Sequence, residues 1–412
     1  MQINIVPPHS INGKVQLPSS KSISNRALVI NALAGTNKLP QNVSDCDDTR
    51  VMIEWLNNRP DIVNIGAAGT AMRFSTALLS VIEGKHSITG TERMRNRPIG
   101  ILVDALRTLG AEIEYEEKEG YPPLSINGNP AIEGGCISLP GNVSSQYISA
   151  LLMIGPSLKK GLTLTLTDSI VSKPYIDMTL SIMRDFGAKC RWVGENTICV
   201  EGVPYGQREY LVESDWSAAS YWYEMVALAE NEDAEVVLPG LFANSLQGDS
   251  RGQDLFKKLG VKTEFVGDDV RISKSGEIVD CLEYDFVEQP DLAQTFVVTC
   301  CMLGVPFHFT GLQSLKIKET DRIEALKVEL AKLGFVIEDR NDSELLWDGV
   351  QLVISPDEIA DIAIGTYEDH RMAMAFAPAA LKLGSFMINN PEVVSKSYPN
   401  YWKNLESIGF KL

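Results

Sequence analysis

The chain has 412 residues with 44% hydrophobic and 22% charged residues, so it is long enough for two globular domains and has no apolar run that could span a bilayer. A formal net charge of −17 excludes the basic surface that a nucleic-acid partner requires, and seven cysteines without a C-x-x-C pair, beside four histidines, predict no metal site. Without a signal-peptide pattern at its start, the protein is expected to be cytoplasmic, with no membrane partner.

The first predicted helix runs from Ser24 to Leu33, and the segment 18–26 before and within it carries hydroxyls, Lys21 and Arg26. A second helix is predicted from Asp47 to Leu56. Because helix N-termini attract phosphate and carboxylate groups, the segment around Lys21 predicts an anion site.

A repeated pattern follows: a helix, an apolar residue, glycine, and then an alternating strand. The glycines lie 73 to 77 residues apart, at Gly110, Gly187, Gly260, Gly334 and Gly409. Glycine suits a helix end because it adopts the left-handed conformation without steric cost. A sixth copy near residue 35 is missing, so the first repeat is expected to be truncated by a surface strand or two. Strands are predicted at 88–90, 162–166 and 270–272, between short amphipathic helices.

Two charged clusters stand in the last hundred residues. Lys318–Arg322 and Asp369–Met372 each pack charges of both signs into four or five residues beside apolar stretches. This is a poor pattern for a solvated helix face, and it predicts a second anion site.

Together these three segments resemble the 5-enolpyruvylshikimate-3-phosphate (EPSP) synthase family. Six further segments match in the family's order over nearly the whole chain: 68–73, 95–100, 143–146, 171–177, 247–249 and 396–401. The resemblance implies an α/β protein of α+β type with the two-domain enolpyruvyl transferase fold, an inverse alpha-beta prism of six βαβαββ-like repeats, three per domain. One domain would combine 1–19 with 214–412, the other would be 20–213, and hinge crossovers would lie near Ser20 and Ser214.

The activity implied by the resemblance is transfer of the enolpyruvyl group of phosphoenolpyruvate to the 5-hydroxyl of shikimate 3-phosphate, with no cofactor and no metal. It implies catalytic roles for Asp291 as proton acceptor and for Glu319 and Lys21 in proton transfer. Shikimate 3-phosphate would be bound by Lys21, Ser22, Arg26, Ser144, Ser145, Gln146, Ser172, Tyr175, Asp291, Ser314 and Lys318. Phosphoenolpyruvate would be bound by Lys21, Gly69, Arg97, Gln146, Arg322, Arg371 and Lys396, with His370 and Asp215 in support.

Several of these residues also have a purely structural interpretation. Asp291 and Asp215 could cap helices, Ser144 could cap the helix that follows it, and His370 could be a satisfied core histidine. Cysteines 300 and 301 lie in an apolar run and are expected in the core.

Two rival functions stay open at this point. A sister enzyme acting on UDP-N-acetylglucosamine would place a reactive cysteine in the loop 91–100, which has none. A catalytically silent member of the fold is the other rival. Ser314 replaces a residue that is commonly larger and polar in the family, which weakens one expected sugar contact. A monomer is expected.

Overall fold

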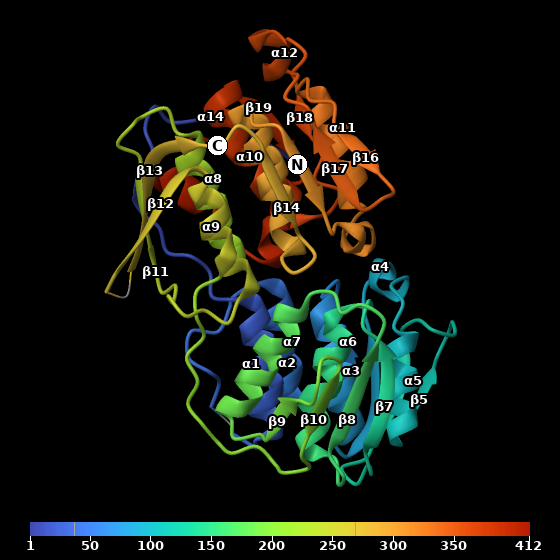
Figure 1. Ribbon diagram of the computed structural model, residues 1–412. Coiled ribbons are helices and arrows are strands. Elements are labelled where there is room, and N and C mark those ends of the chain that lie inside the picture. The colour runs from blue at the N-terminus through green and yellow to red at the C-terminus, as the bar shows by residue number, and fades with distance from the viewer. Residues whose placement is uncertain (37, 268) are drawn as a thin grey trace. The chain divides into compact units, whose positions relative to one another are not determined.

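The computed structural model describes residues 1–36, 38–267 and 269–412, which form two compact units. Unit 1 combines Met1–Pro18 with Glu213–Leu412, and unit 2 is Ser19–Val212 (Figure 1). In the part of the chain described, no helix is long and apolar enough to cross a membrane.

The described residues of unit 2 form two four-stranded sheets with the same strand order. One is β3 (Ile62–Asn64), β4 (Gly84–Thr89), β6 (Leu124–Gly128) and β5 (Glu112–Tyr115), and the other is β7 (Gly135–Pro140), β8 (Leu162–Thr167), β10 (Thr197–Val200) and β9 (Cys190–Trp192). In each sheet the first pair is parallel and the other two pairs are antiparallel. This shared order is the repeat that the glycine spacing indicates.

The described residues of unit 1 form three sheets. Two have four strands: β12 (Leu259–Val266), β13 (Asp269–Ile278), β11 (Glu235–Pro239) and β2 (Asn12–Lys14); and β14 (Leu282–Asp285), β15 (Phe307–Thr310), β17 (Glu344–Trp347) and β16 (Glu338–Arg340). The third joins β1 (Gln2–Ile5), β19 (Phe386–Asn389) and β18 (Ala363–Ile364).

Helices pack against these sheets and against one another. Those of unit 2 are α1 (Lys21–Leu33), α2 (Asp47–Asn58), α3 (Gly69–Val81), α4 (Glu92–Arg95), α5 (Gly100–Leu109), α6 (Ser145–Ile154) and α7 (Lys173–Asp185). Those of unit 1 are α8 (Trp216–Leu228), α9 (Gly252–Lys257), α10 (Ala293–Leu303), α11 (Arg322–Lys332), α12 (Pro356–Ala360), α13 (His370–Phe376), α14 (Ala380–Leu383) and α15 (Tyr401–Ser407). Both helices predicted near the start of the chain are confirmed as α1 and α2.

The expectation that the helices are amphipathic is wrong for the central ones. Twelve of the thirteen residues of α3 are buried, as are twelve of thirteen in α8. Neighbouring helices and sheets surround these segments, so they have no solvent face. Some of their hydroxyl groups bond backward along the helix: Thr76 of α3 donates to the Met72 carbonyl at 2.8 Å, and Ser220 of α8 donates to that of Ser217 at 2.7 Å.

The five repeat glycines all have positive φ, between 83° and 108°. Gly110 caps α5 in the left-handed conformation, as expected for a helix end. Both cysteines of the apolar run lie in the core, Cys300 at 0% and Cys301 at 2% exposure.

In the described residues, unit 2, where the loss of a surface strand or two was expected, has fewer strands than unit 1. The described part of unit 2 has two sheets where unit 1 has three, although β3 survives in the shortened stretch. In place of a third sheet, a single bridge joins Gln41 and Leu211. Its hydrogen bonds run from Gln41 N to the Tyr210 carbonyl at 2.7 Å and from Val212 N to the Gln41 carbonyl at 3.0 Å.

Candidate active site

A cluster of charged side chains lies in unit 1, where the starts of several helices meet. Asp291 lies in the 3-10 turn η3 (Pro290–Leu292) just before α10, and Lys318 and Glu319 follow η4 (Gln313–Ile317). Arg322 begins α11, Arg371 lies in the first turn of α13, and Lys396 ends η6 (Pro391–Lys396). Residues more than a hundred positions apart are thereby brought into one ion-pair network.

Arg322 stands at the centre of this network and is 1% exposed. Its Nε lies 2.7 Å from Asp369 Oδ2, its Nη1 3.1 Å from Asp291 Oδ1, and its Nη2 2.8 Å from Glu319 Oε2. Burial alone would lower the pKa of this guanidinium, but the three carboxylates outweigh burial and raise it. Arg322 is therefore a permanent cation.

Asp291 is held between cations on both of its oxygens. Oδ2 lies 3.0 Å from Arg371 Nη2, while Oδ1 faces Arg322 and lies 3.5 Å from Lys318 Nζ. Burial acts to raise the pKa of Asp291, yet Arg371, Lys318 and Arg322 together hold it well below its usual range. The helix-cap interpretation of Asp291 is wrong, because Leu292 is the N-cap residue of α10.

Glu319 bridges two cations: Oε2 bonds Arg322, and Oε1 lies 3.4 Å from Lys396 Nζ. Lys318, although adjacent in sequence, reaches Asp291. Lys318, Glu319 and Arg322 thus each contact another member of the set, whereas Asp321 caps α11 and pairs with Lys316 at 3.7 Å.

Asp369 is a member of the network to which the sequence interpretation gave no role. It is fully buried, caps α13 by accepting from Arg371 N at 2.9 Å, and accepts from Arg322. His370, 1% exposed, has its Nδ1 3.8 Å from Asp369 Oδ1. The signal that could have identified Asp369 is its place before a helix, where a carboxylate serves as a cap.

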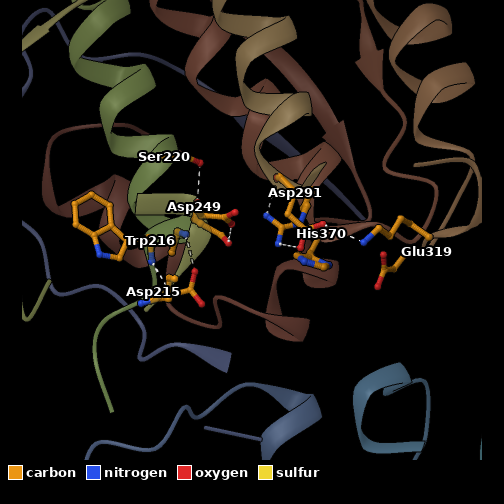
Figure 2. Close-up of polar contacts among 12 residues, drawn as sticks. Asp215, Trp216, Ser220, Asp249, Asp291, Glu319 and His370 are labelled. Atoms are coloured by element: carbon orange, nitrogen blue, oxygen red, sulfur yellow. Dashed lines mark hydrogen bonds and ion pairs between the residues drawn. The ribbon is translucent and has the colours of Figure 1, made fainter. Parts of the chain in front are cut away.

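Asp215 and Asp249 lie at the edge of this network (Figure 2). Asp215 caps α8 by accepting from Ala218 N at 2.9 Å, as its structural interpretation anticipated. Asp249, in the 3-10 turn η2 (Gly248–Arg251), is 4% exposed and accepts a hydrogen bond from the Ser217 hydroxyl. No role was predicted for Asp249 itself.

In unit 2 the predicted residues gather where α1, α3, α6 and α7, which pack against one another, begin. Lys21 and Ser22 form the first turn of α1, whose N-cap Ser20 accepts from Ile23 N at 3.4 Å. Ser144 caps α6 by accepting from Gln146 N, also at 3.4 Å, and Ser145 follows it. Helix N-termini of this length favour anions.

Arg26 links these helices and is 2% exposed. Its guanidinium donates to Thr179 Oγ1 at 2.7 Å, Ser149 Oγ at 3.1 Å and the Ser22 carbonyl at 2.9 Å. The carbonyl of Tyr175 is a fourth acceptor, and among the described residues no carboxylate pairs with this cation. Burial lowers the pKa of Arg26 to about 10. A bound carboxylate would offset that burial cost.

Gly69 opens α3 beneath Arg97. A Cβ on Gly69 would lie 2.6 Å from Arg97 Nη1, so the absence of a side chain lets the guanidinium approach the helix N-terminus. Gln146 reaches the same helix start by donating to Thr70 Oγ1 at 3.1 Å. Gly69, Arg97 and Gln146 are thus brought together.

Two residues predicted for the sugar site, Ser172 and Ser314, are described by their position and burial. Ser172 is buried at the N-cap of α7 with φ 54°, an uncommon conformation for serine. Ser314 lies in η4 of unit 1 and is half-buried, whereas the other serines predicted for the sugar site belong to unit 2. In the described residues, no group of three or more His, Cys, Asp or Glu is arranged to hold a metal ion.

The fold and these residues define a class: an α/β protein of repeated four-stranded units, with a buried arginine pair on Asp291 in unit 1 and a group of helix N-termini in unit 2. A solved structure of EPSP synthase from Acinetobacter baumannii shares this fold, with a TM-score of 0.79 and 23% identity, covering 100% of this chain and 99% of that one.

Relatives and a family model define the membership. The model described as EPSP synthase (3-phosphoshikimate 1-carboxyvinyltransferase) matches residues 5–59 and 56–405. A protein of that name from Bacteroides fragilis is 57% identical over 410 residues, covering 100% of this chain and 98% of the relative. One from Photobacterium damsela subsp. piscicida is 37% identical over 438 residues, covering 98% and 99%. The chain belongs to the EPSP synthase family.

Proposed function

We propose that this protein is a transferase that joins the enolpyruvyl group of phosphoenolpyruvate to the 5-hydroxyl of shikimate 3-phosphate, a step of the shikimate pathway. The observation that carries the proposal is the arginine pair of unit 1. Arg322 and Arg371 hold one carboxylate, that of Asp291, between two guanidinium groups. Planar guanidinium groups bind carboxylates with two-point geometry, which suits the carboxylate of phosphoenolpyruvate.

The reaction proceeds by addition and elimination. The 5-hydroxyl oxygen forms a bond to C2 of phosphoenolpyruvate, its proton passes to a base, and C3 takes a proton from an acid. C3 then loses a proton while the bond from C2 to the phosphate oxygen breaks, which restores the double bond and releases inorganic phosphate. The chemistry needs one base, one acid and cations for the phosphates and carboxylates.

Asp291 is the proposed base, and its ion pairs determine when its carboxylate is basic enough to accept a proton. Three cations hold its pKa well below the usual range, so Asp291 is a weak base while these ion pairs are intact. A substrate carboxylate on Arg322 and Arg371 would neutralise part of that charge and raise the basicity of Asp291. Glu319 and Lys21 are proposed to share the proton transfer at C3.

The remaining roles follow the same chemistry. Lys21, Gly69, Arg97, Gln146 and Lys396 would hold the phosphoenolpyruvate phosphate. Arg26 and Ser22 would take the shikimate carboxylate, since Arg26 is a buried cation paired only with neutral oxygens among the described residues. The 3-phosphate would be bound by Ser144, Ser145 and Ser172, with Tyr175, Ser314 and Lys318 completing the sugar site. His370 and Asp215 would support the site, and a cytoplasmic monomer without cofactor is part of this proposal.

The test is release of phosphate from phosphoenolpyruvate, measured in parallel with shikimate 3-phosphate and with UDP-N-acetylglucosamine. The expected result is release with the shikimate ester alone. Release with the nucleotide sugar alone would assign the sister activity, and release with neither, from folded protein, would indicate a silent member of the fold.

A further inference from the structure

Asp249 is a buried carboxyl group that the proposed reaction does not use. The Ser217 hydroxyl donates to its Oδ2, whereas its Oδ1 has no hydrogen-bond partner within the described residues. A carboxylate with one unsatisfied buried oxygen is costly, so this environment favours the protonated form.

The groups that act on Asp249 come from several elements. Asp291 of η3 and Asp215 before α8 oppose its ionisation, and Arg371 of α13 favours it. Tyr284 of β14 also faces it, and α9, which packs against the same turn, carries Asp254 and Lys257. Arg251, in the same turn, pairs instead with Glu288 at 2.7 Å. In Figure 2 the carboxyl group of Asp249 lies between the labelled Asp215 and Asp291.

The charge of the neighbouring network depends on this proton. Counted over the ion pairs given above for the described residues, the network has four cations and three carboxylates: Lys318, Arg322, Arg371 and Lys396 against Asp291, Glu319 and Asp369. It therefore carries a net positive charge beside a neutral Asp249. Ionisation of Asp249 would cancel that charge.

We propose that Asp249 is a positioning residue whose proton sets how strongly the arginine pair of unit 1 attracts an anionic substrate. When protonated, Asp249 leaves the network positive and favours binding of the phosphoenolpyruvate carboxylate. When ionised, it competes for Arg371 and opposes that binding. This inference rests on the proposed function for the identity of the anion.

The proton is exchanged in the neutral pH range. Burial, followed by the charge of Asp291, raises the pKa of Asp249 to about 7, and Ser217 counteracts the rise by hydrogen bonding to the carboxylate. Loss of the Ser217 hydroxyl would raise this pKa further. Ser217→Ala is therefore a matched partner for the isosteric Asp249→Asn, which imitates the permanently protonated state.

The experiment compares KM for phosphoenolpyruvate between pH 6 and 8.5 in the wild type, Asp249→Asn and Ser217→Ala, with shikimate 3-phosphate saturating. Relative to Asp249→Asn, the wild-type KM should rise roughly tenfold across this range, the order expected from one nearby unit charge. The rise should move to higher pH in Ser217→Ala. The titration of phosphoenolpyruvate itself is common to all three proteins and cancels in the comparison.

A constant ratio of wild-type to Asp249→Asn KM over the whole range would overturn the proposal. If Asp249→Asn fails to fold, an unmoved profile in Ser217→Ala would overturn it equally. Carboxyl carbon-13 NMR of the ligand-free protein separates this result from failure of the proposed function, because an Asp249 resonance titrating near neutral pH requires no turnover. Absence of such a titration would also contradict the proposal.

Discussion

Individual side chains of unit 1 form a network in which each acid touches at least one cation. The central contacts, from Arg322 to Asp291, Glu319 and Asp369, are 2.7 to 3.1 Å long. Removing one partner from a buried pair leaves the other charge uncompensated, which costs more than the pair itself contributes. Substitutions in this network should therefore retain shape and hydrogen bonding.

Asp291→Asn tests the proposed base. Turnover should fall at least about a hundredfold, since the amide cannot accept the hydroxyl proton and general-base catalysis contributes about 10² to 10⁴. Phosphate release measures the rate, and circular dichroism checks the fold. Asp361→Asn, at an exposed position, is the control and should retain wild-type turnover. Comparable rates in both variants would remove Asp291 from the mechanism.

Gly69→Ala tests the approach of Arg97 to the start of α3. The new Cβ would lie 2.6 Å from Arg97 Nη1, so the guanidinium must move, and KM for phosphoenolpyruvate should rise roughly tenfold. KM for shikimate 3-phosphate should change little. Gly206→Ala, where the nearest atom is 3.7 Å away, is the matched control. An unchanged KM for phosphoenolpyruvate would contradict a role for Gly69 and Arg97 in holding it.

The charged residues of unit 1 could be predicted as a set because two short motifs contain most of them. Their pairing could not. Lys318 contacts Asp291 while its neighbour Glu319 contacts Arg322 and Lys396, and this alternation depends on where η4 ends. Asp249 was harder still, because its raised pKa comes first from burial and then from the charge of Asp291, which lies far away in sequence.

At the scale of helices and strands, the repeat glycines show which local features can be predicted from the sequence. A residue that must adopt positive φ is restricted by its own backbone, so glycine at a helix end predicts the element boundary directly. The burial of α3 could not be predicted from the sequence, because its serine and threonine residues suggest a polar face. Only the structure shows that Thr76 and Ser80 turn their hydroxyls back to carbonyls of the same helix.

Gly334→Ala and Gly187→Ala separate backbone strain from steric conflict. Their φ values are nearly equal, 85° and 87°, but a Cβ would lie 2.3 Å from the Leu352 carbonyl oxygen at Gly334 and 3.9 Å from Gly206 N at Gly187. Gly187→Ala should destabilise by about 1–2 kcal/mol, the cost of a left-handed side-chain residue. Gly334→Ala should lose about 1–3 kcal/mol more through overpacking. Thermal denaturation of both variants measures the difference, and equal losses would mean that the Leu352 segment moves freely.

At the scale of the whole molecule, the number of sheets distinguishes the two units. Sequence periodicity located the truncated repeat, since five glycines recur and the sixth does not. It did not reveal that the remaining segments pair through a bridge and not through a third sheet, because the flanking helices α1 and α2 keep their patterns. Strand pairing depends on partners distant in the chain, here Gln41 and Leu211.

Overall stability should depend on pH through Glu224, a fully buried carboxyl in the middle of α8. Burial raises its pKa well above the usual value. Below about pH 4.5 the group is protonated in both states; above that pH the unfolded chain ionises first, so stability declines until the folded-state pKa is passed. Relative to Glu224→Gln, the wild type should lose about 1.4 kcal/mol per pH unit above that point.

Urea unfolding at pH 5, 6 and 7 measures this difference, and subtraction of the variant removes the contributions of all other groups. A difference that stays constant with pH would mean that Glu224 is ionised in the folded protein. The two units need not unfold together, so the transition of unit 1 should be followed with a probe located there, such as Trp216 or Trp222.

The bridge between Gln41 and Leu211, which stands in place of a third sheet in unit 2, also affects how easily the segment 203–212 opens locally. Where a sheet would protect a row of amides, the bridge of Gln41 retains only two backbone hydrogen bonds, to Tyr210 and from Val212. These two hydrogen bonds can break while the surrounding helices stay folded. Amide protons of 203–212 should exchange with deuterated solvent well before those of β4 and β8. In limited proteolysis, the first cleavage within unit 2 should fall in the same segment, 203–212.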